Sequence, residues 1–319
     1  MIKVIRLTAL AAVFTFFGCS EEPVVLPSHE TEGEELVEFT VTVSGSQTKL
    51  TGTDDMSSDV HNTQVFVFNT YGICEAYTMV DSHTLTMTCP AGRKRVVALV
   101  NAKPETGIVD VEDLARRTSD LRNVTDDDLV MVGETTVDVP HSKGHAMNIT
   151  VKRLVAQVIL SSVTLDFGQQ EYQDMDFEIT SVYMINVAGE KAYMEQNVPS
   201  IWYNEGMCDP VSSLPFLCDA VTDGALVSGG DMYETEHYFY CYPNETEKKT
   251  RLVIETLIDG MVYYYPITLD KVEANNRYFY DVVLTRLGSM SPDQPVEDVL
   301  TSFVIATTNW KDNMNDVEI

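Results

Sequence analysis

The stretch that decides the fold reads LVEFTVTVSGSQTKLTGTDD, residues 36–55. In its first half Phe39, Val41 and Val43 alternate with polar side chains, the period of two that sets one apolar row against a core. Residues 44–52 follow, small and polar, with the single basic residue Lys49 in their middle. Exposed loops of this kind are preferred sites of proteolysis. We therefore predict a strand followed by a cuttable hinge, and hypothesise that the strand is a plug removed so that another subunit can take its place.

Strand-like segments continue through the rest of the chain, and long helical periodicity is nearly absent. Apolar runs predict strands over residues 64–68, 77–80, 84–88, 96–100, 129–132, 135–139, 149–160, 163–167, 177–186, 237–242, 251–258, 261–269, 277–287 and 301–306. Asp259-Gly260 is the strongest hairpin signal, and the basic segment 91–95 is expected to form a turn. One helix is expected over residues 110–120, where Val111 and Leu114 share a face.

These segments predict an all-β fold with few short helices, made of two tandem β-sandwich domains of transthyretin-like or Greek-key type. A chain of 319 residues is long enough for two such domains. The pattern changes beside Lys152-Arg153, and the boundary is expected there. The expected parts are residues 1–18 (signal peptide), 19–49 (tether and removable strand), 50–152 (first sandwich) and 153–319 (second sandwich).

The N-terminus carries an export address. A basic start and an apolar core of eleven residues, 7–17, form a secretory signal that is too short to span a bilayer. Phe16-Phe17-Gly18-Cys19 resembles the bacterial lipobox, in which the cysteine is acylated, and Ser20-Glu21-Glu22 resembles the export signal of Bacteroidetes surface lipoproteins. Cys19 is therefore the predicted lipidation site of a cell outer membrane protein, with an ordinary secretory signal as the alternative.

The charge excludes several classes of partner. The formal net charge of −28 argues against nucleic acid, which is bound through clustered Lys and Arg. It argues equally against electrostatic attachment to anionic lipid. Solubility is the simplest reason for the acidity.

Catalytic and metal-binding constellations are hard to find, so we expect no enzyme activity, no catalytic residues, no metal and no cofactor. The six histidines are scattered, and His141 and His145, four apart, lie in a segment that Pro140 and Gly144 make a turn. The runs at residues 54–55 and 126–128 lack the spacing of a calcium loop.

Five cysteines remain beside Cys19, and their pairing is left open. Cys74 could pair with Cys89 or Cys208 with Cys218, which leaves Cys241 over. The alternative is that all five are small apolar side chains, which we favour for Cys89 and Cys241.

Aromatic clusters leave one rival function open. The strands with Tyr238–Tyr242 and Tyr263–Tyr265 suggest cross-strand packing more than a sugar platform. The long irregular region 187–231 contains Trp202 and Tyr203, which would be the site if the chain were a glycan-binding surface lipoprotein.

Several stretches together resemble the fimbrillins of Bacteroidia, the FimA/Mfa-type lipoprotein subunits of type V pili. They are Thr48–Gly52 at the processing site, Gln64–Asn69, Ala91–Arg93 leading into Val96–Asn101, Lys152–Gln157, Asn275–Tyr278 and the C-terminal segment from Gly288 to Trp310. The resemblance covers essentially the whole chain.

The resemblance implies a structural subunit of a fimbrium that supports adhesion and biofilm formation. A trypsin-like surface protease would cut between Lys49 and Leu50, and the strand of Phe39, Val41 and Val43 would leave a groove. The C-terminal segment of another subunit, residues 296–319, would fill that groove, with Phe303, Ile305 and Trp310 as donor residues.

The expected partners are therefore other pilus subunits, the protease, and the outer membrane through the lipid. The family's best-known proteases prefer Arg where this chain has Lys49. A lipidated anchor or a tip subunit of the same pilus is therefore the alternative role.

Overall fold

The computed structural model describes residues 36–45, 60–142, 144–168, 175–194, 198–208, 214–226, 232–294 and 302–309, with the backbone alone for 223–226 and 302–309. Strands dominate these ranges, and the five-residue α1 (Val111–Ala115) is their only α-helix. The all-β prediction is confirmed. The division into two domains at residue 152 stays a prediction, because residues 35–319 group as one compact unit.

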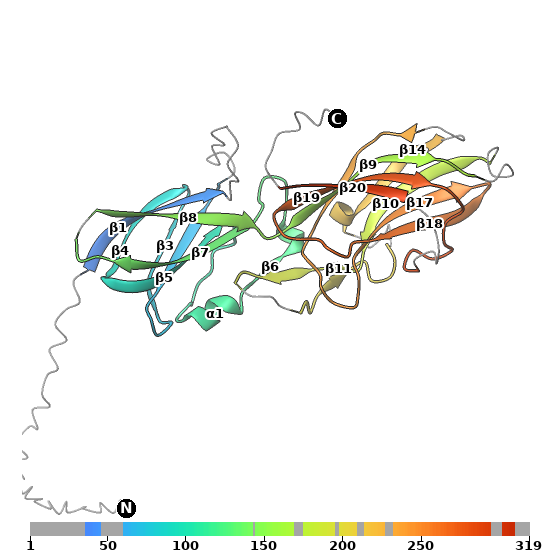
Figure 1. Cartoon of the computed structure of the whole chain (residues 1–319). Coiled ribbons are helices and arrows are strands. Elements are labelled where there is room, and N and C mark those ends of the chain that lie inside the picture. The colour runs from blue at the N-terminus through green and yellow to red at the C-terminus, as the bar shows by residue number, and fades with distance from the viewer. Residues whose placement is uncertain are drawn as a thin grey trace, which may run out of the picture. The chain divides into compact units, whose positions relative to one another are not determined.

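Seven strands from the first half of the chain follow one sheet path, in the order β3-β2-β5-β7-β8-β1-β4 (Figure 1). Their bounds are β1 (Leu36–Gly45), β2 (Thr63–Phe68), β3 (Cys74–Val80), β4 (Thr84–Pro90), β5 (Gly92–Val100), β7 (Met131–Val139) and β8 (His145–Arg153). β7 and β8 pair only at Met131 with Arg153 and Val132 with Lys152. The path therefore divides into a three-stranded layer, β8-β1-β4, and a four-stranded layer, β3-β2-β5-β7. Apolar side chains from both layers pack in one cluster.

The second half builds two further main sheets. One runs β14-β10-β17-β18; the other runs β15-β9-β19-β20, with β16 also on β9. The bounds are β9 (Ala156–Leu165), β10 (Phe177–Ile185), β14 (Cys218–Leu226), β15 (Met232–Tyr233), β16 (His237–Cys241), β17 (Arg251–Ile258), β18 (Met261–Thr268), β19 (Asn276–Leu284) and β20 (Ser302–Asn309). Short elements complete the described ranges: β6 (Thr118–Asp120), η2 (Leu121–Asn123), β11 (Val187–Ala188), β12 (Glu190–Ala192), β13 (Trp202–Tyr203) and η4 (Pro215–Leu217).

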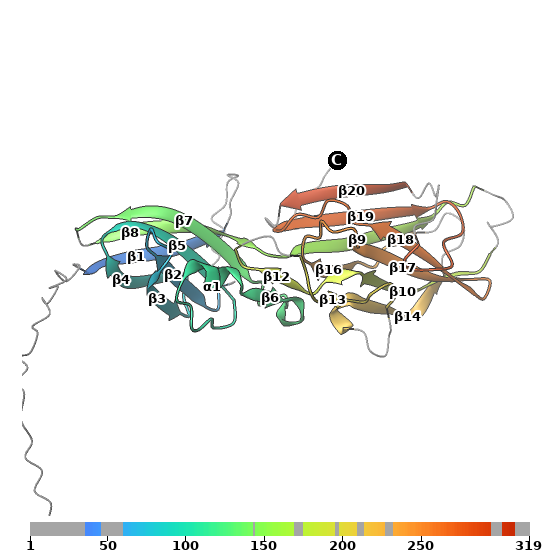
Figure 2. The ribbon, with the colours of Figure 1, turned by 90° about the horizontal axis from the view of Figure 1, so that it is seen from below.

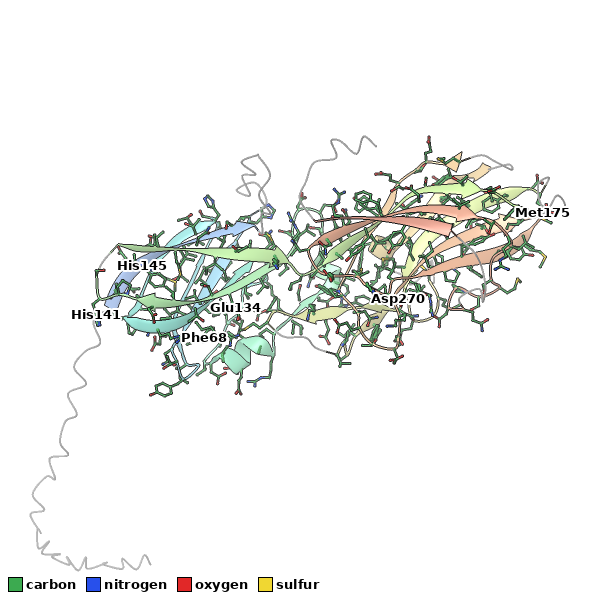
Figure 3. The ribbon with its side chains drawn as sticks, in the orientation of Figure 1. Phe68, Glu134, His141, His145, Met175 and Asp270 are labelled. Atoms are coloured by element: carbon green, nitrogen blue, oxygen red, sulfur yellow. The ribbon has the colours of Figure 1, made fainter. Side chains whose placement is uncertain are left out.

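β2 separates two hydrophobic cores. All six of its residues are buried, because each face of the strand is covered. Val65 and Val67 belong to the cluster that includes β1. Phe66 and Phe68, the latter labelled in Figure 3, belong to a larger cluster that continues into the second half of the chain.

The segment between β5 and β7 joins the two halves of residues 35–319. β6 pairs with β12 in an antiparallel ladder. The Tyr193 hydroxyl donates to Glu105 Oε1 at 3.0 Å, and the Tyr242 hydroxyl donates to Ser119 Oγ at 2.9 Å. Phenols whose oxygens bond in this way can be buried at little cost.

The predicted helix over residues 110–120 is wrong in length. Asp110 caps α1 by accepting a hydrogen bond from the Asp113 amide at 2.8 Å. The helix ends at Ala115 because residues 118–120 pair with β12 instead. A strand partner distant in sequence overrides the local preference.

Two strand predictions and one turn prediction need correction. Residues 149–160 are two strands, because β8 ends at Arg153 and β9 begins at Ala156. Residues 129–139 are one strand from Met131, not two. The basic segment 91–95, expected as a turn, opens β5: Lys94 points inward and pairs with Glu75 at 2.5 Å, which a buried ammonium requires. The Asp259-Gly260 hairpin is confirmed, with φ of 47° and 78° as a primed turn needs.

The carboxylate of Glu190, the first residue of β12, predicts a loss of stability in acid. The hydroxyl and amide of Ser200 donate to its Oε1 at 2.6 and 3.0 Å, and they hold the pKa of Glu190 below its usual value despite partial burial. A lowered folded-state pKa contributes stability above the unfolded pKa, which is lost as the pH falls through the folded pKa. Glu190→Gln should lower the free energy of unfolding by about 1 kcal/mol or less at pH 7.

The difference between Glu190→Gln and the parent should shrink as the pH falls below about 4, the range where a free glutamate titrates. Urea unfolding at a series of pH values measures it. The exposed Glu112→Gln serves as the control. A difference that stays constant from pH 7 to pH 3 would contradict the assignment.

Candidate functional site

β1 is the middle strand of its layer. It runs parallel to β8 and antiparallel to β4, and Figure 2 shows it between them. Val41 lies opposite Met147 of β8 and Leu85 of β4. Both backbone edges of β1 are thereby paired. Removing β1 would leave two unpaired strand edges facing each other across a gap one strand wide.

The inward row of β1 is sealed from water. Val37, Phe39, Val41 and Val43 are 1%, 1%, 0% and 4% exposed. They share a cluster with side chains of β2 and β5 in the facing layer and of β4 and β8 on either side. Full burial of an apolar side chain of this size is worth about 1.5–3 kcal/mol, so an empty groove would be costly.

The outward row of β1 is polar and makes light contacts. The Thr40 and Thr86 hydroxyls lie 3.4 Å apart, and those of Thr42 and Thr84 lie 3.2 Å apart, across the β1–β4 ladder. These contacts leave the inward row to set the register.

The residues that would release β1 lie outside the described residues. β1 ends at Gly45 and the chain is described again from Val60, so Lys49 and Leu50 fall between the two ranges. Cys19 also precedes the described residues. Cleavage and lipidation at these positions stay predictions.

The predicted donor strand lies in a different sheet from β1. β20 pairs with β19 in an antiparallel ladder at the sheet edge, with Phe303 opposite Val282 and Ile305 opposite Tyr280 (Figure 2). Trp310 lies outside the described residues, and the side chains of Phe303 and Ile305 do too. The structure thus brings the three groove residues together and keeps β20 apart from them.

The described residues hold no group of three or more His, Cys, Asp or Glu that could bind a metal ion. His141 and His145 flank the turn between β7 and β8, as Figure 3 shows. No helix in the described ranges is long and apolar enough to cross a membrane.

The described cysteines bear on the pairing that the sequence left open. Cys74 and Cys89, on β3 and β4, are free thiols and do not pair with each other. Cys89 and Cys241 are buried, as expected for small apolar side chains, and burial raises the pKa of Cys241 to about 12. Cys208 and Cys218 both pack against one small cluster of β10 and β17.

The aromatic residues of the rival glycan site are engaged within the chain. Trp202 is half-buried with the Lys248 ammonium 4.8 Å from its ring centroid. The Tyr203 hydroxyl donates to Asp120 Oδ1 at 2.9 Å, and burial together with this bond raises the pKa of Tyr203 to about 12. Such contacts fix the rings as packing groups.

Two polar clusters escaped the sequence analysis. The hydroxyls of Tyr238 and Tyr240 both donate to the Asp126 carboxylate, at 2.8 and 2.7 Å. Asp293 forms an ion pair with Arg251. Acids in turns are common in this chain, and no local signal marks these two.

The described residues form an all-β fold in which the first strand, β1, fills the middle of a layer. No family model matches the sequence, and no curated protein matches it. Solved structures do match its fold. A candidate cell adhesion protein of Bacteroides eggerthii has a TM-score of 0.68 at 18% identity, covering 86% of this chain and 96% of that one.

Two fimbrial proteins of Porphyromonas gingivalis share the fold as well. The fimbrilin FimA has a TM-score of 0.63 at 14% identity, covering 86% of this chain and 97% of its own. The tip fimbrial protein Mfa3, in a C-terminally truncated form, has a TM-score of 0.53 at 13% identity, covering 86% of this chain and all of its own. The chain therefore has the fimbrillin fold that the sequence resemblance predicted.

Truncating the inward row of β1 tests its contribution. Phe39→Ala should destabilise the uncut protein by about 3–5 kcal/mol, because it opens a cavity in a sealed core. Glu38→Ala, on the exposed row, should change stability by less than about 0.5 kcal/mol. Urea unfolding followed by far-ultraviolet circular dichroism measures both. Equal effects of the two substitutions would contradict the burial pattern.

Proposed function

We propose that this chain is a structural subunit of a surface pilus, activated by proteolysis and polymerised by strand exchange. The observation that carries the proposal is the place of β1: a middle strand with its inward row sealed, followed four residues later in the sequence by Lys49, where we propose that cleavage occurs. The fold shared with FimA and Mfa3 supports the same role. This function needs no catalytic residue, and we propose no enzyme activity.

The activation step begins at the cell surface. The precursor is acylated at Cys19 and displayed on the outer membrane, where a trypsin-like protease cuts between Lys49 and Leu50. β1 then loses its covalent link to the rest of the chain, and only noncovalent contacts hold it. Delivery with the groove filled prevents aggregation through two open strand edges.

The core that β1 does not touch keeps the cut subunit folded. None of the β1 side chains belongs to the larger cluster that runs from Phe66 and Phe68 into the second half. Losing β1 therefore opens one core and leaves the other closed. A folded subunit with an empty groove is the species that can accept a new strand.

The C-terminal segment of another subunit offers apolar side chains for the two central inward positions of β1. Aligned without gaps, TSFVIAT (residues 301–307) places Phe303 at the position of Phe39 and Ile305 at that of Val41, the two central inward positions, while Thr301 and Thr307 fall at the positions of Val37 and Val43. We propose that the donor strand enters in the direction of β1, parallel to β8, so that backbone pairing is restored on both sides. β20 would first have to leave β19 of its own chain.

Apolar contact and backbone pairing must drive assembly, because charge opposes it. Removal of residues 1–49 takes away three of 21 basic and seven of 49 acidic residues, which leaves 18 against 42 and a formal charge of −24. Like-charged subunits repel one another at distances up to about a Debye length. The polymer should therefore form faster in 0.5 M salt than in 0.05 M salt.

Limited trypsin digestion of the purified precursor tests the proposal. Cleavage after Lys49, established by N-terminal sequencing, should yield filaments in electron micrographs. Lys49→Ala should stay monomeric under the same digestion. A precursor lacking residues 296–319 should be cut and stay folded but form no filaments. Cut protein without filaments, or filaments from the shortened chain, would contradict the mechanism.

A further inference from the structure

The connector, which follows β19 and is described over residues 285–294, is hydrogen-bonded to the edge of the neighbouring sheet. The Tyr265 hydroxyl donates to the Arg286 carbonyl at 2.9 Å. Tyr264 and Ser289 exchange two backbone hydrogen bonds, both 2.8 Å long. Gly288 permits this approach, because a Cβ there would lie 2.5 Å from the Tyr264 carbonyl oxygen. The connector thus forms a bridge to the outer edge of β18, an end strand of its sheet, at Tyr264.

Asp293, near the end of the described part of this connector, contacts Asn186, which follows β10, and Arg251, the first residue of β17. Its Oδ1 accepts a hydrogen bond from Asn186 Nδ2 at 2.8 Å and pairs with the Arg251 guanidinium. The Arg251 side chain is 14% exposed, and that of Asp293 is 45% exposed. Pairs that are partly shielded from water in this way are screened by salt less than fully exposed ones.

Asn186 is itself rigidly held, which makes it a firm attachment. It is 4% exposed and adopts a left-handed backbone conformation with φ of 53°. Its amide donates to the Asn204 carbonyl and its Oδ1 accepts from the Gly206 amide, both at 2.9 Å. Asp293 is therefore tied to the end of β10 through Asn186 and to the start of β17 through Arg251.

We infer that Asp293, bonded to Arg251 and Asn186, is a positioning residue for strand donation. It fixes the point on the subunit from which the C-terminal segment extends to the next subunit. The inference rests on the proposed function, in which residues 296–319 are donated. That segment begins three residues beyond Asp293. When β20 leaves β19, tension from the neighbouring subunit acts first on the Asp293–Arg251 ion pair. The Tyr264–Ser289 hydrogen bonds therefore stay intact.

The contacts of Asp293, here called the anchor, set the length of the donated C-terminal segment. Without the anchor, residues 286–293 could separate from β18 and lengthen that segment by eight residues, at roughly 3.3–3.6 Å each. Added length of that size would let successive subunits sit at variable spacings. A donated segment that starts at a fixed place gives a regular filament.

Hydrogen exchange on the uncut full chain tests the anchor without any polymer. Asp293→Asn should raise the exchange rate of the Tyr264 and Ser289 amides by about tenfold or more, since it removes a charge-assisted contact. Amides in the β9–β19 ladder should be unaffected. Arg251→Lys, which keeps the charge but loses the planar fork, is the second variant. Glu134→Gln, which breaks the exposed Arg95–Glu134 pair, is the matched control.

Electron microscopy of the trypsin-cut proteins tests the role in strand donation. Asp293→Asn filaments should form but show a broader distribution of subunit spacing than those of the parent and of Glu134→Gln. Unchanged exchange at Tyr264 and Ser289 in both variants overturns the anchor. Raised exchange with parental spacing overturns its role in donation. If the cut parent forms no filaments, the proposed function fails and takes the positioning role with it, whatever the exchange rates show.

Discussion

The pairing of β1 on both sides is the constraint on which the rest of the structure depends. β8 and β4 do not touch each other through backbone hydrogen bonds, and only β1 joins them into a layer. The same strand supplies four sealed side chains to the core beneath it. Emptying the position of β1 would unpair the facing edges of β4 and β8 and open the core beneath them. Whatever occupies it must offer an alternating apolar row and two free backbone edges.

The division of the apolar side chains into two clusters makes such a vacancy tolerable. β2 and β5 present one face to β1 and the other to the segment between β5 and β7. The second cluster reaches through Leu114 and Leu121 into the sheets of the second half. The subunit that we propose is cut after Lys49 would thus keep most of its buried apolar side chains. Its vacancy would be local, with the shape and register of a single strand.

Sequence reasoning was strongest where the signal is local. The alternation of Phe39, Val41 and Val43 predicts their shared burial, and Asp259-Gly260 predicts its hairpin. It failed where the partner lies far away in the chain. No local sequence signal near residues 118–120 predicts their pairing with β12, so the predicted helix is too long. The identity of β4 and β8 as the neighbours of β1, and of Arg251 as the partner of Asp293, depends on long-range contacts. The residues in these contacts are separated by between 42 and more than 100 positions in the sequence.

The direct test of the account is a cross-link between the groove of one subunit and the C-terminal strand of another. Leu85 lies opposite Val41 in the β1–β4 ladder, so Ile305 of a donated strand should lie opposite Leu85. Subunits carrying Leu85→Cys and subunits carrying Ile305→Cys, each with the native cysteines after residue 19 replaced by alanine, are mixed, cut with trypsin and oxidised. The account predicts a disulfide-linked dimer that appears only after cutting. Two results would contradict the proposed strand exchange and its direction. One is filaments without the cross-link. The other is a cross-link to subunits in which Cys89, which lies opposite Val37, is the only cysteine kept after residue 19.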